Sequence, residues 1–464
     1  MNLLLLAALL VTPGPVADFQ VHRFGVPRLA VVQEEPPTAP RTKAEIEKDL
    51  AEARSANETE SILEYLFELI DFYLAEEDYE EALKQAEEAE KLAGSIEDDS
   101  LQYTVQYYLA EAYYGLENAE SAIKHFRDAM RLAVRIDFKD GEFYTAYRLT
   151  LLLEEEGLLE EALKIGREAL SLAVELGEKE SQAALHDVMG NIYSNQEKWE
   201  LAVKEYQEGL VLYRELKDDN EIASSLEVLA ECFVELEDYS KAEAHYSEAI
   251  PFLRSSRQYG TLPDTLEAYS EVLHKVGKSK EARATLLETI AFQHVHFSAA
   301  RRIKGLLQYG EQSPSAPLQI FLAKYSATTL HELLRRSEQA QGRQNSQSVA
   351  KEILSLMVGP DIEENIREVL VSAKADKLVK GLENLGKEEG LGPSFEYSAK
   401  EKGFAEALEK LYSDSAKMRT QAFMLMTSED KEAGNRLAKL FEKDILEFSK
   451  KVEEVLLSIE KGLQ

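Results

Sequence analysis

Alanine recurs every 40 residues through the first two thirds of the chain, and this period constrains the fold more than any other feature. The series comprises Ala82, Ala122, Ala162, Ala202, Ala242 and Ala282. Parallel series keep small residues seven positions later, as at Ala89 and Ala129, and large apolar residues at positions such as Leu69 and Leu109. A fixed period of this length indicates a tandem array of one structural unit.

Each unit contains two apolar stretches with helical spacing, separated by a short polar break such as NQEK at 195–198. This pattern predicts a helical hairpin. Trp199 begins the second helix of one hairpin, and Ala202 leaves room beside it, so we assign the pair to packing. Six hairpins over 58–297 exceed the three or so that a continuous core needs. Before them, Thr42 and Glu45 have capping-box spacing, which predicts a capping helix at 41–57.

The pattern resembles the tetratricopeptide repeat (TPR) family, in a variant with a 40-residue period and about six repeats. The resemblance rests on the alanine series and on a set of small and aromatic positions. These are Ala110, Gly190 and Ala230, then Tyr73, Tyr113, Tyr193 and Phe233, and finally Phe126, Tyr206 and Tyr246. The family's helix-ending proline is missing from every unit, which fits a longer second helix. The resemblance implies an all-α, right-handed superhelix.

In that family the first helix of each hairpin lines a concave groove that holds a peptide or a partner's helix. The resemblance therefore implies a partner-binding groove formed by Glu64, Phe67, Glu68, Asp71, Tyr107, Tyr108, Glu111, Tyr114, Tyr144, Tyr147, Arg148, Glu154, Asp187, Asn191, Glu227, Glu231, Asp264, Glu267 and Glu271. Arg148 and Lys275 are the only basic residues set against the acidic residues of this predicted groove. The cations with which some members grip a terminal carboxylate are lacking, so the resemblance does not extend to such a clamp.

The acidic charge is concentrated in the repeat region. The formal net charge is -33, of which residues 301–464 contribute -1 and residues 1–300 the remaining -32. Nucleic-acid binding is disfavoured, because it needs a clustered basic footprint. Two interpretations of this negative charge stay open: it keeps the protein soluble, or it attracts a basic partner. Tyrosines between acidic residues favour a basic, partly apolar protein or peptide segment.

The first 40 residues differ in composition from the repeats. The apolar run from Leu3 to Val11 is too short to span a bilayer but suits the central region of a signal peptide, although a basic flank is missing. Four prolines at 26–41 indicate a linker. We expect residues 1–40 to be a signal peptide with a proline-rich linker, with export slightly favoured over a cytoplasmic location.

From residue 298 the 40-residue register fails while helical patterning continues, which predicts a separate helical domain over 298–464. Its last helix places Phe441, Ile445, Phe448, Val452, Val455 and Ile459 at coiled-coil spacing. This seam either packs inside the same domain, which we favour, or mediates self-association.

No motif carries recognisable chemistry. GLENLGKE at 381–388 satisfies a phosphate-loop spacing, but Glu388 stands where a hydroxyl is needed. HELLR, from His331, has arginine where a zinc-protease helix needs its second histidine. The single cysteine, Cys232, lies in an apolar helical stretch and is expected to be a buried hydrophobe. We expect no catalytic residues, metal or cofactor.

The sequence thus predicts a non-enzymatic interaction scaffold or adaptor. One alternative is a regulator whose superhelix closes on a short peptide. Another is an enzyme with an unrecognised site in the C-terminal helices.

Overall fold

The structure is a computed structural model. It describes residues 41–296, 299–341, 362–382, 391–413, 418, 421 and 431–464. The predicted signal peptide and proline-rich linker lie outside these residues. The described residues form helices joined by turns and contain no strand, so the predicted all-α class is confirmed. Within these ranges, every helix is too short or too polar to span a bilayer.

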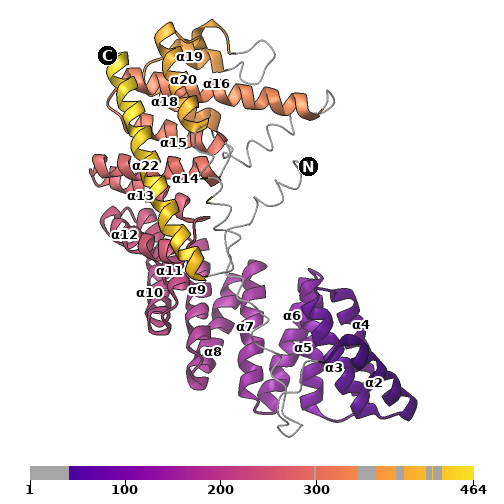
Figure 1. Cartoon of the computed structure of the whole chain (residues 1–464). Helices are drawn as coiled ribbons and strands as arrows, with labels where there is room; N and C mark the ends of the chain where they lie inside the picture. Colours follow the sequence, from indigo (N-terminus) through magenta and orange to yellow (C-terminus); the bar gives the residue numbers. More distant parts are fainter. Residues whose placement is uncertain are drawn as a thin grey trace. The chain divides into compact units, whose positions relative to one another are not determined.

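The chain divides into two compact units, residues 1–216 and 217–464. In the described part of unit 1, each helix packs against its sequence neighbours (Figure 1). These helices are α2 (Lys43–Ala56), α3 (Thr59–Ala75), α4 (Tyr79–Ala93), α5 (Asp99–Gly115), α6 (Ala119–Arg135), α7 (Lys139–Glu155), α8 (Leu159–Leu176), α9 (Lys179–Asn195) and α10 (Trp199–Leu216).

Unit 2 continues the hairpins and adds further helices. Its elements are α11 (Asp219–Glu235), α12 (Tyr239–Ser255), α13 (Leu262–Lys275), α14 (Ser279–His296), α15 (Ala299–Glu311), α16 (Ala316–Gln341), α18 (Ile362–Ser372), α19 (Asp376–Gly381), η3 (Pro393–Phe395), α20 (Ala399–Ser413) and α22 (Lys431–Leu463). One apolar core joins residues from both sides of position 298, including Ile290 of α14 and Phe321 of α16. The domain boundary at 298 stays a prediction.

The turns inside the hairpins follow the same 40-residue period. Each has one residue with positive φ: Glu77, Glu117, Gly157, Glu197, Glu237 and Gly277. The next residue donates its N–H to a carbonyl in the last turn of the first helix, as Asp78 does to Tyr73 at 2.9 Å. This Schellman geometry usually requires glycine, but four of the six turns place glutamate there. Because glycine is absent from four of these turns, the sequence showed a polar break between the helices but no glycine signal for the helix ends.

The small positions are sites of close helix contact. All six alanines of the series are fully buried, at 0% exposure. A Cβ added to Gly190 would lie 2.6 Å from the Tyr206 ring, and one added to Gly115 would lie 2.1 Å from the Tyr79 ring. Tyr79 occupies the position equivalent to Trp199 and packs against the first helix of the next hairpin. The packing role of Trp199 itself stays a prediction.

The first helix of the array has its predicted cap. The Thr42 side chain accepts the Glu45 N–H, and the Glu45 carboxylate accepts the Thr42 N–H, which completes a capping box. Ile46 and Leu50 are buried. The apolar face of α2 therefore covers the start of the array.

The predicted coiled-coil seam of α22 is buried within this chain. Phe441, Ile445 and Val452 are each 0% exposed, and α22 lies against α14, α16 and α20 (Figure 1). The seam therefore packs within this chain, in part against α14, which precedes the predicted domain at 298–464.

Ala202→Leu should destabilise the protein by about 1–3 kcal/mol, because a well-packed interior has no room for three further carbons. Thermal unfolding measures the effect. Lys204→Leu adds the same side chain on the exposed side of α10 and should leave the melting temperature nearly unchanged. An equal response of the two variants would contradict the packing role of Ala202.

Ile445→Asp combined with Val452→Asp should destabilise unit 2, because two carboxylates would be buried without partners. Sedimentation should show the mass of the parent protein at low concentration. Leu457→Asp, at a position 41% exposed on the same helix, is the control. A parent oligomer that the double variant converts to a stable monomer would show that the seam is intermolecular.

Candidate functional site

The predicted groove residues lie on the first helices of the hairpins, and the structure gives them unequal exposure. Glu64, Asn191, Glu231, Asp264 and Glu271 are exposed, whereas Tyr107, Tyr108, Glu111 and Glu267 are buried. The others are half-buried, namely Phe67, Glu68, Asp71, Tyr114, Tyr144, Tyr147, Arg148, Glu154, Asp187 and Glu227. We describe the residues of α3, α5, α7 and α9 as the unit 1 face.

At the start of the unit 1 face, acidic residues are paired within the protein. The Tyr108 ring stacks on Phe67 at 5.5 Å between centroids, and its hydroxyl donates to Asp71 Oδ1 at 2.6 Å. Glu68 forms an ion pair with Arg41 at 3.1 Å. The sequence analysis did not single out Arg41, which precedes α2 and lies outside the 40-residue register.

The centre of the unit 1 face is an ion pair between α5 and α7. Arg148 Nε and Nη2 donate to the two carboxylate oxygens of Glu111, each at 2.7 Å. Both side chains are only 11% exposed, and the guanidinium lies 4.7 Å from the centre of the Tyr114 ring. Burial alone would lower the pKa of Arg148, but the Glu111 carboxylate and nearby tyrosines raise it. The Arg148 guanidinium therefore forms its ion pair with Glu111 inside the protein.

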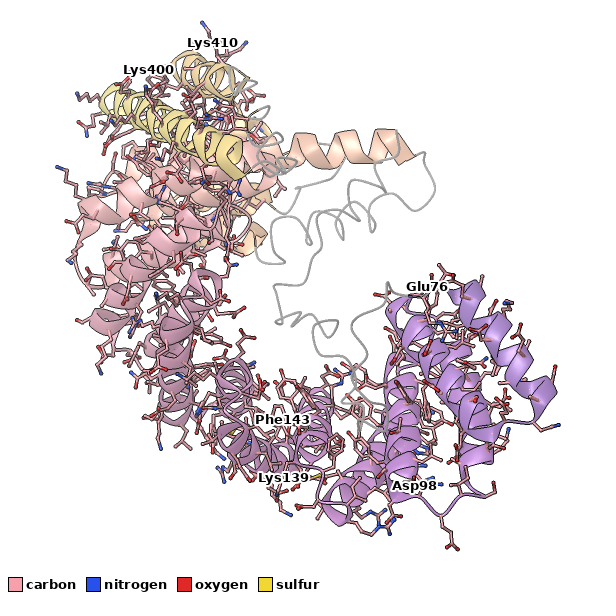
Figure 2. All side chains as sticks on the ribbon, turned by 60° about the horizontal axis from the view of Figure 1, so that its bottom comes forward. Glu76, Asp98, Lys139, Phe143, Lys400 and Lys410 are labelled. Carbon is pink, nitrogen blue, oxygen red and sulfur yellow. The ribbon has the colours of Figure 1, made fainter. Side chains whose placement is uncertain are left out.

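The tyrosines of this face divide into two groups. Tyr107 is 7% exposed and packs edge-on against Phe126 of α6 at 5.8 Å, so Tyr107 and Tyr108 belong to the core. Tyr144 and Tyr147 are half-buried, and their rings lie 4.9 and 6.2 Å from the ring of the buried Phe143 of α7. Figure 2 labels Phe143. Burial raises the pKa of Tyr147 to about 12.

In unit 2, five carboxylates line α11 and α13, and we call Glu227, Glu231, Asp264, Glu267 and Glu271 the acidic face. Thr265 donates a hydrogen bond to Glu227. Burial, together with Glu231 and Asp264, raises the pKa of Glu227 to about 7 against the opposing effect of Thr265. Burial also raises the pKa values of Glu231 and Glu271. Glu231 and Glu271 are thus exposed on one side and lose part of their hydration to the neighbouring protein atoms.

Glu267 is the buried member of the acidic face, at 8% exposure. Lys304 forms an ion pair with it, and the amides of Gln293 and Gln308 donate to it at 3.1 and 2.9 Å. Sequence reasoning missed Lys304. Stepping 40 residues from Asp264 reaches it, but the register had been taken to end at 298.

The described residues do not assemble a site for covalent or metal chemistry. They contain no group of three or more His, Cys, Asp or Glu side chains placed to hold a metal ion. Cys232 is 2% exposed, and burial raises its pKa to about 12, so its thiol is protonated at neutral pH. The 381–388 motif lies mostly outside the described residues.

Comparison with known proteins identifies the repeat. The tetratricopeptide repeat family model matches residues 180–255. The apo form of RapI is similar, with 15% identity and a TM-score of 0.51, over 72% of this chain and 96% of that one. NprR, a quorum sensor from B. thuringiensis, in its apo form has 14% identity and a TM-score of 0.44, over 72% and 94%. BtubC (BKLC) from P. vanneervenii has 19% identity and a TM-score of 0.42, over 48% and 93%.

No curated protein matches the sequence. The family model and the likeness to RapI show that the hairpins form a TPR-type helical solenoid. The predicted fold and the recognised repeat are both confirmed.

The raised pKa of Glu227 predicts a pH-dependent stability. The folded protein holds the carboxyl proton of Glu227 more tightly than the unfolded chain does. Glu227 therefore contributes to the free energy of unfolding fully below about pH 4.5, and this contribution is lost as the pH rises through about 7. Glu227→Gln should flatten this decline, as measured by urea unfolding across that range. Glu281→Gln, at an exposed position of α14, should keep it. Parallel pH profiles for all three proteins would contradict the shift.

Proposed function

We propose that this protein is a non-enzymatic scaffold or adaptor that binds a basic, partly apolar segment of another protein through the first helices of its hairpins. The TPR-type fold supports a role in protein–protein interaction. The observation that carries the proposal is the acidic face, where Glu231, Asp264 and Glu271 expose carboxylates from two successive hairpins.

The proposed partner follows from charge and shape. Partly desolvated carboxylates attract cations more strongly than fully hydrated ones, because the local dielectric constant is lower. Tyr144 and Tyr147 of the unit 1 face offer half-buried rings that suit aliphatic or aromatic side chains. A segment that alternates cations with apolar residues offers groups suited to either surface.

Binding should depend on salt and on these two kinds of residue in different ways. A labelled peptide in which lysine alternates with leucine should bind the full chain, whereas a glutamate–leucine peptide should not. Glu231→Lys with Glu271→Lys should slow association and flatten its salt dependence. Tyr144→Ala with Tyr147→Ala should chiefly speed dissociation.

Stopped-flow kinetics separate the two effects. Val134→Ala, which truncates an apolar side chain 55% exposed on α6, is the control for the tyrosines and should change neither rate. The proposal would be refuted if the peptide bound equally well at low and high salt and if neither pair of substitutions changed its binding. The acidic residues would then serve only to keep the protein soluble.

A peptide-switched regulator is the second candidate. The division of the chain into two compact units favours it, since a ligand that binds one arrangement of two units better than another shifts the population between them. Small-angle scattering distinguishes the candidates. A switch compacts when the peptide binds, and a scaffold keeps its radius of gyration.

A further inference from the structure

The residues that precede the repeat array join it at the edge of the unit 1 face. The Arg41 guanidinium forms ion pairs with Asp49 of α2 and with Glu68 of α3, the latter at 3.1 Å. It also lies 5.0 Å from the centre of the Tyr65 ring of α3. Thr42 then caps α2. Because Glu68 belongs to the unit 1 face, the segment before Arg41 is tethered beside the first hairpin of that face.

Part of that segment has the chemistry proposed for a partner. Residues 19–33, FQVHRFGVPRLAVVQ, follow the apolar run of the predicted signal peptide and lie outside the described part of the chain. They contain Arg23 and Arg28 but no Asp or Glu. Phe24 and Leu29 directly follow the two arginines, so each cation has a large apolar neighbour. The stretch is therefore a basic, partly apolar segment within the chain itself.

The unit 1 face offers a matching stripe on α7. Four half-buried residues follow one another there at helical spacings of three and four, namely Tyr144, Tyr147, Leu151 and Glu154. This spacing places them on one side of the helix. Among the side chains that the structure describes, the Tyr147 hydroxyl has no hydrogen-bond partner and Glu154 has no ion-pair partner. Burial and the neighbouring Glu155 raise the pKa of Glu154, so a cation beside it would offset the hydration that this carboxylate has lost.

The first helix of the array repeats this combination. Glu64, Phe67 and Leu74 of α3 have the same spacing, with Glu64 exposed and the other two half-buried. Glu64 forms no ion pair with any described residue. Both α3 and α7 thus combine half-buried apolar side chains with a carboxylate that lacks an ion-pair partner. Arginines that adjoin large apolar residues complement this combination in charge and in polarity.

The length of the chain allows the contact. When fully extended, the seven residues 34–40 span at most about 25 Å and the fifteen residues 19–33 at most about 50 Å. Packed helices lie about 8–10 Å apart, so the four first helices of unit 1 extend over about 30–40 Å. Residues 19–33 can therefore reach both α3 and α7 from the tether at Arg41.

We propose that residues 19–33 dock on the unit 1 face of the same chain, and that a partner's basic segment displaces them. Their arginines lie beside the carboxylates, and their apolar side chains lie against Phe67, Tyr144 and Tyr147. This inference rests on the proposed function, since it gives the chain's own segment the chemistry of the partner. A short tether holds a segment at an effective concentration of about 1 mM. An intrinsic Kd of about 100 µM would then fill the face about nine-tenths of the time and weaken an outside ligand about tenfold.

The first test releases the segment in the full chain. Arg23→Glu with Arg28→Glu, which we call the released variant, should bind a labelled peptide of sequence 19–33 about tenfold more tightly than the parent protein in fluorescence anisotropy. The matched control is Lys450→Glu with Lys451→Glu, which changes the net charge equally at exposed positions of α22. The control should leave the affinity within about twofold. The absence of a gain in the released variant, or an equal gain in the control, would overturn the inference.

Two further measurements locate the contact. Benzoylphenylalanine in place of Phe24 should cross-link under light to α3 or α7 within one chain, and mass spectrometry of the monomer band identifies the attached residues. In the released variant, Tyr144→Ala with Tyr147→Ala should weaken the 19–33 peptide about tenfold. Val134→Ala, at a position 55% exposed on α6, is the control and should not weaken it. Cross-links confined to dimers, or to helices outside the unit 1 face, would overturn the inference.

The outcomes separate this inference from the proposed function. If the 19–33 peptide fails to bind the released variant at low salt while the lysine–leucine peptide still binds, the inference is overturned and the binding of basic segments remains. If neither peptide binds any of these proteins at low salt, the proposed function is refuted as well. Circular dichroism checks that every variant keeps its helical content.

Discussion

The close approach of two helices at an alanine is the contact on which the rest of the array depends. A side chain of one carbon lets the helices of a hairpin meet, and the large residues nearby, such as Tyr206 against Gly190, fill the space around that contact. Burial is complete at all six alanines of the series. Because each hairpin packs on its neighbours within its unit, the geometry of this one contact is repeated inside each unit.

Within each unit, that repetition brings equivalent positions of successive first helices onto one face, so their charges need partners. Removing a carboxylate from water is costly unless a cation or donors replace the water. Unit 1 does so with its own arginines, so that Arg148 and Glu111 form a two-pronged pair. Unit 2 leaves Glu227 with a threonine hydroxyl and a pKa raised to about 7. This difference is the reason for proposing that a partner binds at the acidic face.

The ends of a solenoid need different treatment from its middle, because a terminal unit has an apolar face without a neighbour. At the start, α2 covers that face with Ile46 and Leu50. In unit 2, α22 contributes Phe441, Ile445 and Val452 to a core that it shares with α14, α16 and α20. A coiled-coil spacing is thus satisfied inside one chain, since an apolar stripe packs equally well against any complementary helix surface.

The sequence by itself determined the hairpins, the alanine contacts and the capping box of Thr42 and Glu45. These features depend on local spacing, and local spacing is visible in the chain. Only the tertiary structure decided which of the predicted groove residues are exposed. Positions 107 and 147 are equivalent in the repeat, yet Tyr107 is buried against Phe126 while Tyr147 stays half-buried. The pairings of Arg41 with Glu68 and Lys304 with Glu267 were equally hidden. Exposure and charge pairing depend on which side chains meet across helices, and the period that fixes the backbone leaves those side chains free to vary.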